Sequence, residues 1–394
     1  MPSRFPSDPA QNRTALLAAV ESIRDIVTAH ADDAEARGTL PPAIVEALDT
    51  TGLLTLKLPT ALGGAEADPM TQFDVIEALS AIDPSTGWCL MIGGTGIGLP
   101  GAFLPDAAIA QMFAGGRIPR GAIVSIPPGQ AIPVEGGYRV SGRWAFVSGV
   151  RHAQWITVGA RIEPHGAAPA ETRFMVVPVA VAEVHDTWRD VAGLKGTGSC
   201  DISLTNVHVP APFSWNRLLT PPARGGALYR LGHPGFVANE HAAFALGVGR
   251  GALDAVIALA RSKRRSFAPS PTALESRPVF QRAIGLSDLR LRAARELVLK
   301  IYTEAWAFAC AGEVPPPHLQ AQLRSVTAFA TEVAVDVTTQ AFRYAGGSAV
   351  YGSHCLQRHL RDINVAAQHL MVSDIAYENH GQFALGIPGA DPLR

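Results

Sequence analysis

The stretch GLKGTGSCDISLTNVHVP, residues 193–210, joins a loop of small residues to a segment with the character of a β-strand. Cys200, Ile202 and Leu204 alternate with polar neighbours, which is the period of a half-buried strand. The small residues of KGTGS, at 195–199, let backbone amides approach a ligand, although a simple turn is equally compatible with them. This stretch therefore predicts one strand of a β domain, preceded by a candidate ligand-binding loop.

The surroundings of this stretch predict the rest of the architecture. Short segments rich in β-branched and aromatic residues fill 118–215 and predict a central β domain, either a small barrel or a sandwich. Helical periodicity fills 1–117, the predicted N-terminal helical domain. Longer amphipathic stretches over 225–394 predict a C-terminal four-helix bundle, with PPARGG at 221–226 as the linker. We therefore expect a mainly α protein with a central β domain.

Composition excludes several classes of function. The chain has 394 residues, and its 33 Lys and Arg balance its 34 Asp and Glu, which argues against a large nucleic-acid footprint. The start lacks a signal-peptide core, and no run approaches the ~20 apolar residues of a membrane span, so we expect a cytoplasmic protein. The four cysteines are far apart, and the histidines have no spacing that favours a metal site. The sequence contains no GxGxxG loop between a strand and a helix and no Walker loop, so we expect no nicotinamide or nucleoside triphosphate site.

Four stretches carry a resemblance to a known family. They are GLLTLKLPTALGGAEAD (52–68), GGYRVSGRWAFVSGVRHAQW (136–155), the 193–210 stretch, and YAGGSAVYGSHCLQRHLRDINVAAQH (344–369). Together with the order of helices, β domain and bundle, they resemble the acyl-CoA dehydrogenase superfamily over nearly the whole chain. The resemblance implies the fold of that superfamily.

The chain departs from the dehydrogenases where their chemistry resides. Those enzymes carry a catalytic glutamate eight or nine residues after an Arg-Asp pair, where this sequence has His369 and Leu370. RWxFxSG with a nearby HAxW, and LQRxLRD…QH, are instead similar to the flavin-dependent monooxygenase branch. That branch includes hydroxylases of 4-hydroxyphenylacetate and of a steroid-derived phenol, dibenzothiophene monooxygenase and indole oxygenases.

The resemblance implies the oxygenase component of a two-component system. Such an enzyme takes reduced flavin, FMNH2 or FADH2, from a separate NAD(P)H:flavin reductase and lets it react with O2. The resulting C4a-(hydro)peroxyflavin oxygenates an aromatic or heteroaromatic small molecule. The usual assembly of the branch is a homotetramer.

Two residues are the catalytic candidates. The resemblance places Ser148 beside flavin N5, where its hydroxyl can accept from N5–H or donate to a flavin or peroxide oxygen. His369 borders the apolar face of a helix predicted over 361–370. Its imidazole can deprotonate the substrate or protonate the peroxide. The structural alternatives are a serine in an ordinary turn and a core histidine with a satisfied hydrogen bond.

The other candidate residues are assigned by the resemblance. Trp144 and Phe146 are expected on the same strand face as Ser148, against the flavin, with core aromatics as the alternative. The remaining flavin-binding candidates lie in the small-residue loop and on the inter-subunit side of the bundle: Thr197, Gly198, Ser199, Arg265, Phe267, Gly346, Gly347 and Gln357. Apart from the resemblance, the candidates for the substrate pocket are Trp88, His233, Asn239, His241 and His369, with an ordinary structural role as the alternative for each of the first four.

Two other functions stay open on the sequence. One is an acyl-CoA dehydrogenase or oxidase whose base has moved to Glu378 or Glu240. The other is a flavin-binding protein that keeps the fold without the chemistry. Tightly bound oxidised flavin that acyl-CoA bleaches would favour the dehydrogenase.

Overall fold

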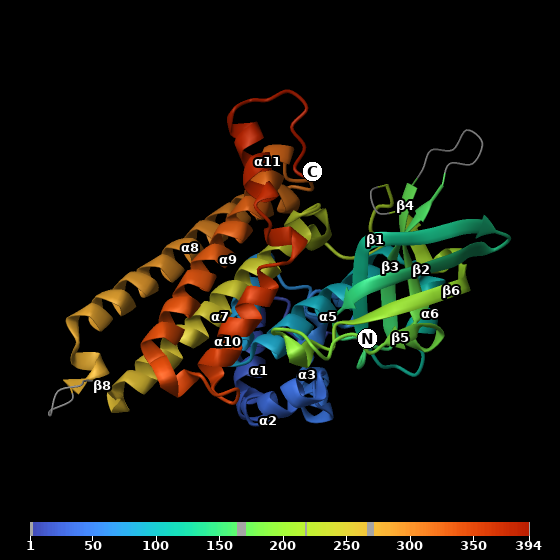
Figure 1. Cartoon of the computed structure of the whole chain (residues 1–394). Helices are drawn as coiled ribbons and strands as arrows, with labels where there is room; N and C mark the ends of the chain where they lie inside the picture. The colour runs from blue at the N-terminus through green and yellow to red at the C-terminus, as the bar shows by residue number, and fades with distance from the viewer. Residues whose placement is uncertain (1–2, 164–170, 217–218, 266–271, 394) are drawn as a thin grey trace. The chain divides into compact units, whose positions relative to one another are not determined.

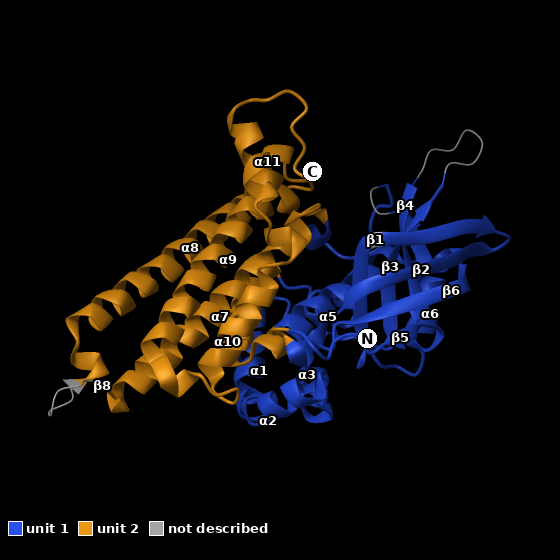
Figure 2. Ribbon diagram, viewed as in Figure 1, with its two compact units in different colours: residues 1–67, 88–191, 195–229 blue, residues 68–87, 192–194, 230–394 orange. Residues whose placement is uncertain are grey.

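The computed structural model describes residues 3–163, 171–216, 219–265 and 272–393. The chain forms two compact units (Figure 2). Unit 1 consists of residues 1–67, 88–191 and 195–229, and unit 2 of residues 68–87, 192–194 and 230–394. Unit 1 contains N-terminal helices together with the sheet, and unit 2 contains the bundle. The three predicted domain ranges remain a prediction.

The helices of unit 1 begin and end where the sequence signals them. Asp8 caps the first helix by accepting a hydrogen bond from the backbone N–H of Gln11, and proline occupies the first turn. Gly38 and Gly52 end the next two helices in the left-handed conformation, at φ of 65° and 75°. The helices are α1 (Pro9–Ser22), α2 (Arg24–Arg37), α3 (Pro42–Thr51), α5 (Pro84–Phe103, in unit 1 from Trp88) and α6 (Asp106–Met112).

The predicted β domain is a single seven-stranded mixed sheet (Figure 1). The strand order is β5-β6-β2-β1-β3-β4-β7, and β1 pairs with β3 in parallel while its pairing with β2 is antiparallel. The 193–210 stretch supplies β6, as its alternation predicts. The strands are β1 (Gly121–Val134), β2 (Gly137–Val147), β3 (Trp155–Ile162), β4 (Glu171–Pro178), β5 (Glu183–His185), β6 (Cys200–Pro210) and β7 (Ser214–Asn216).

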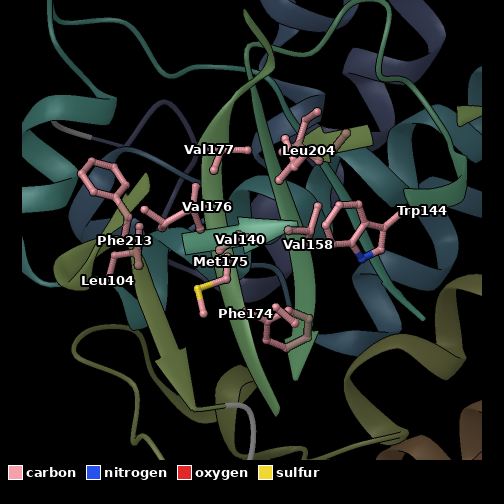
Figure 3. Close-up of a cluster of buried hydrophobic side chains, with 14 of the residues drawn as sticks. Leu104, Val140, Trp144, Val158, Phe174, Met175, Val176, Val177, Leu204 and Phe213 are labelled. Atoms are coloured by element: carbon pink, nitrogen blue, oxygen red, sulfur yellow. The ribbon is translucent and has the colours of Figure 1, made fainter. Parts of the chain in front are cut away.

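One hydrophobic cluster gives the sheet its core (Figure 3). Val140, Val158, Met175 and Leu204 come from neighbouring strands and are buried together with Trp144. Trp144 is fully buried, and its indole N–H donates to the carbonyl oxygen of Gly159 at 3.0 Å. Burying an indole demands such a partner, so this bond fixes the ring in the core.

The end of β2 differs from the expected alternation. The pairing of β2 with β6 shifts register between Trp144 and Val147, and Phe146 adopts a φ of 63°. A β-bulge inserts an extra residue and re-aims the side chains around it. Trp144 is therefore buried while Phe146 is 70% exposed, and the two do not share the face that the spacing predicted.

Unit 2 is a helical bundle whose central helix is α7 (Figure 1). α7 packs against α4, α8, α9 and α10. It is long and apolar enough to cross a membrane by length and composition alone, but 61% of its most apolar window is buried within the protein, as in a core helix. The helices are α4 (Pro69–Ile82), α7 (Gly235–Ser262), α8 (Pro278–Cys310), α9 (Pro317–Ala345), α10 (Cys355–Ala366) and α11 (Ile375–Ala384), with β8 (Arg264–Arg265) and β9 (Thr272–Ala273) as a short ribbon.

The helix predicted over 361–370 is shorter than expected. α10 ends at Ala366, and His369 lies beyond it as the cap of the 3-10 helix η9 (Leu370–Val372). Backbone bonds from Ala367 and Gln368 close the last turn of α10. The Ala-Ala-Gln-His run carried no glycine or proline that would have indicated this end.

Candidate functional site

A chain of buried hydrogen bonds surrounds Ser148 in unit 1. The indole N–H of Trp88 donates to Ser148 Oγ at 2.9 Å. Ser148 Oγ lies 2.7 Å from Ser199 Oγ, which lies 2.6 Å from Thr197 Oγ1. All four side chains are buried. The tryptophan predicted to line a substrate pocket thus contacts the predicted catalytic serine directly.

Backbone geometry brings these residues together. Ser148 follows the last residue of β2, and Val147 pairs with Cys200 at the start of β6. The N–H of Gly149 donates to the carbonyl oxygen of Thr197 at 2.9 Å, which joins the serine turn to the small-residue loop. Gly198 has a φ of 56°, so the loop uses glycine where a left-handed residue is needed.

The series of buried hydrogen bonds limits what Ser148 can offer to a ligand. Its hydroxyl has one proton and two lone pairs, and Trp88, which can only donate, occupies one lone pair. If Ser148 donates to Ser199, one lone pair is left to accept from a ligand. If Ser199 donates to Ser148, only the Ser148 proton is left to donate. The direction of the Ser148–Ser199 bond therefore decides between the two roles that the sequence left open.

Phe146 lies two residues before this serine and presents its ring to solvent. That ring and the ring of Trp188 form a T-shaped pair, with centroids 6.1 Å apart and planes at 81°. A phenylalanine with positive φ is an outlier that persists only where its surroundings hold it, and such outliers gather at functional sites. Of the two strand aromatics predicted to contact flavin, Phe146 remains available. Trp144 is a core residue, because its indole is fully buried and its N–H donates to a carbonyl oxygen inside the sheet.

In unit 2 the second catalytic candidate forms a pair of imidazoles. The rings of His369 and His241 stack with centroids 4.3 Å apart and planes at 29°. His241 is buried on α7, whereas His369 is exposed after α10. The guanidinium of Arg324 donates to the carbonyl oxygen of Leu370 at 3.0 Å and so fixes the segment that follows His369.

The tautomer of His369 follows from its cap. Nδ1 accepts a hydrogen bond from the backbone N–H of Met371 at 3.2 Å, so in the neutral ring the proton is assigned to Nε2. The surrounding protein desolvates the ring and lowers the pKa of His369 to about 4. The side chain keeps part of its surface in solvent, which offsets some of that effect, but the direction of the shift keeps the imidazole neutral at pH 7. A neutral ring with the proton on Nε2 is a hydrogen-bond donor at that nitrogen.

The other substrate-pocket candidates have different surroundings. The amide nitrogen of Asn239 donates to the carbonyl oxygen of Pro69 and to Gln72 Oε1, both at 3.2 Å, and the residue is buried. Asn239 therefore joins α7 to the start of α4, and its assignment to a substrate pocket stays a prediction. His233 is exposed just before α7.

The predicted inter-subunit residues are only partly described. Gly346 and Gly347 form the turn after α9, and Gln357 Oε1 accepts from Arg361 Nε at 2.8 Å within α10. Arg265 lies in β8. Phe267 lies outside the described residues.

Some residues of the site gave no signal in the sequence. Trp188 against Phe146 and Arg324 beside His369 come from distant segments. Trp88 was placed in a substrate pocket, and its bond to Ser148 across 60 positions could not be read from spacing. Within the described ranges, no group of three or more His, Cys, Asp or Glu side chains is arranged to hold a metal ion.

Comparison with known proteins identifies the family of this chain. Residues 11–102 match the model of the acyl-CoA dehydrogenase N-terminal domain, and residues 240–374 match that of the C-terminal domain. An indole-3-acetate monooxygenase of Pseudomonas putida is 30% identical over 352 residues, 88% of each chain. A pigment production hydroxylase of Rhodococcus sp. is 30% identical over 393 residues, 97% of this chain and 99% of the relative.

A solved structure is similar over nearly the full length. XiaF from Streptomyces sp., in complex with FADH2 and glycerol, superimposes with a TM-score of 0.87 at 27% identity and covers 98% of both chains. The fold and the branch expected from the sequence are therefore confirmed. This chain belongs to the flavin-dependent monooxygenases of the acyl-CoA dehydrogenase superfamily.

Proposed function

We propose that this chain is the oxygenase component of a two-component monooxygenase that uses reduced flavin and O2 to oxygenate an aromatic or heteroaromatic small molecule. The observation that carries the choice within the superfamily is the His369–His241 pair. An imidazole donor stands where the resembled dehydrogenases have a carboxylate. Neither rival base stands at the position that the resemblance gives the carboxylate, because Glu378 lies on α11, beyond His369, and Glu240 is buried within α7.

The residues of unit 1 fit a flavin ring system. The exposed ring of Phe146 offers an aromatic surface, and Ser148 offers a single hydrogen bond whose direction Ser199 sets. The small loop with Thr197 and Gly198 offers backbone near the same serine. Reduced flavin, FMNH2 or FADH2, when bound there, supplies the electrons that activate O2.

His369 is proposed to act on the substrate as a donor. Its Nε2–H can hydrogen-bond to an oxygen or ring atom and orient it, and it can release that proton as charge develops. To act as a base, the ring would first have to exchange the Met371 bond for the other tautomer. The stacking on His241 and the Arg324 bond hold the ring in place for this role.

The partners follow from the same proposal. An oxygenase component needs a separate NAD(P)H:flavin reductase, and we propose a cytoplasmic location for both. A homotetramer is supported by exposed apolar side chains on α8, namely Leu286, Leu289 and Leu297, which a subunit contact would cover.

Oxygen consumption with reduced flavin tests the proposal. The protein, a flavin reductase, NADH and either FMN or FAD are combined, and O2 uptake is recorded across a panel of phenols, indoles and aromatic sulfides. Uptake stoichiometric with an oxygenated product is expected for at least one substrate class. Bleaching of bound oxidised flavin by acyl-CoA, with no oxygenated product from the panel, would instead support the dehydrogenase.

A further inference from the structure

Unit 1 contains a cavity of about 350 Å³ that the proposed reaction does not use. The N-terminal segment, the end of α3, the middle of α5, the residues entering β1 and the ring of His152 line it. Ser148 and the side chains bonded to it are not among the lining residues. A volume of this size falls within the ~300–1,000 Å³ of small-molecule sites.

The charged groups of this cavity are mostly positive. Arg4, Arg117 and Arg120 face one carboxylate, that of Asp49. Arg120 forms an ion pair with Asp49 at 2.5 Å and donates to the carbonyl oxygen of His152 at 2.6 Å. Arg4 donates to the backbone carbonyls of Asp49 and Thr50 at 3.4 and 3.1 Å. Among the described residues, neither Arg4 nor the exposed Arg117 has a carboxylate partner, so the cavity carries a surplus of positive charge.

The remaining walls combine the hydroxyl side chains of Thr50 and Thr55 with apolar side chains and bare backbone. Leu54, Ile97 and Ile118 contribute hydrocarbon, and Gly93 and Gly121 present backbone without a side chain. A Cβ at Gly93 would lie 3.1 Å from Leu54 Cδ2, so the cavity depends on that glycine for part of its room.

His152 supplies an uncharged polar group to the same space. Its Nδ1 has no hydrogen-bond partner among the described residues, and burial together with the charge of Arg120 lowers the pKa of His152 to about 4. The neutral imidazole can hydrogen-bond to a ligand without adding charge. Its own backbone N–H donates to the carbonyl oxygen of Gly149 at 3.1 Å, within the turn that follows Ser148.

We propose that this cavity is a binding site for an aromatic carboxylate, separate from the site of oxygenation. The planar guanidinium forks match a carboxylate in two-point contact, and the apolar walls match the ring. A fully hydrated inorganic anion would leave those walls against water, so an organic acid fits the lining better. A ligand bound in this cavity can influence the turn after Ser148 through the hydrogen bond between His152 and Gly149.

Calorimetric titration of the intact chain without flavin tests this site, with 2-naphthoate as the probe. We expect one 2-naphthoate per chain with a Kd below about 1 mM. The neutral 2-naphthamide and inorganic phosphate should each bind at least tenfold more weakly. The amide lacks the charged carboxylate, and phosphate lacks the aromatic ring. Equal binding of either compound overturns the assignment to an aromatic carboxylate.

Variants locate the bound probe. Arg117→Ala should weaken 2-naphthoate binding by about tenfold, since it removes a charged hydrogen-bond partner, and Arg4→Ala should act in the same direction. Arg139→Ala is the matched control, an exposed arginine on β2 of the same unit that does not line the cavity. Loss of binding in His369→Ala together with unchanged binding in Arg117→Ala would place the probe at the oxygenation site and overturn the proposal. Failure of the O2-uptake experiment would leave this test unaffected.

Discussion

The Ser148 chain of unit 1 is enclosed, whereas the His369–His241 pair of unit 2 ends in an exposed ring. Ser148 is only 5% exposed and is fixed by hydrogen bonds from residues far away in the sequence. His369 is fixed by local capping, by stacking and by the anchored segment behind it. The buried hydroxyls leave a ligand one hydrogen bond whose direction they set among themselves, while an exposed imidazole can exchange protons with a ligand or water. The two regions thus suit a flavin-tuning role and a substrate-directed role, respectively.

Removing the exposed imidazole tests the substrate-directed role and should have the largest effect. His369→Ala should lower oxygenation turnover by about a hundredfold or more, the usual size of a general acid–base contribution. Flavin affinity, measured by fluorescence titration, should stay the same. His369→Gln, whose amide can still accept from Met371 and donate outward, should recover part of the turnover. Turnover equal to that of the parent in His369→Ala would remove His369 from the mechanism.

Breaking the enclosed chain should have a smaller and redox-selective effect. When Ser148 accepts from reduced flavin, its proton goes to Ser199, so Ser199→Ala leaves that proton without an acceptor. We expect reduced-flavin affinity to fall by about two- to tenfold, equivalent to one hydrogen bond, and oxidised-flavin affinity to fall less. Anaerobic and aerobic titrations measure the two dissociation constants.

Thr157→Val is the matched control for that experiment. Thr157 is buried in unit 1, and its hydroxyl has no hydrogen-bond partner in the part of the chain that the structure describes. An unchanged ratio of the two dissociation constants is expected in this variant. The same ratio change in Thr157→Val as in Ser199→Ala would mean that general loosening of unit 1, rather than the hydroxyl chain, is responsible.

Acid should weaken the protein through histidines held neutral in the fold. The pKa of His152 is lowered from 6.5 to about 4, so the unfolded chain binds this proton first as the pH falls. Its contribution to stability is therefore lost between pH 6.5 and 4 and is unchanged above pH 7. His152→Gln should lose less melting temperature than the parent between pH 7 and pH 4.5, measured by thermal unfolding. An equal loss in both proteins would show that other groups govern this range.

The smallest effect is expected at an exposed ion pair beside the same sheet. Arg143 contacts Asp201 at 3.0 Å, but the arginine side chain is 58% exposed. Arg143→Ala should therefore change the free energy of unfolding by less than about 1 kcal/mol. Urea unfolding provides the measurement, and a larger loss would indicate that Arg143 supports the turn as well as the surface.

The sequence predicted the elements with strong local signals. Alternation at Cys200, Ile202 and Leu204 identified β6, and Gly38 and Gly52 marked the ends of two helices. Such signals are local because capping and strand burial act over a few residues.

Features that depend on distant contacts could not be predicted. The bulge before Ser148 depends on the pairing of β2 with β6, and it separates Trp144 from Phe146 although spacing alone puts them on one face. The end of α10 at Ala366 lacks a breaking residue. The stacking of His369 on His241 joins positions more than 120 residues apart, which spacing does not reveal.

Phe146 has a consequence for how the protein tolerates change. Its left-handed backbone costs a non-glycine residue roughly 1–2 kcal/mol, which glycine would avoid. Glycine at position 146 would be less strained, but it would remove the exposed ring that is proposed to face the flavin. Improvement of stability and retention of function therefore compete at this position, and a selection for thermal resistance alone would tend to erase the ring first.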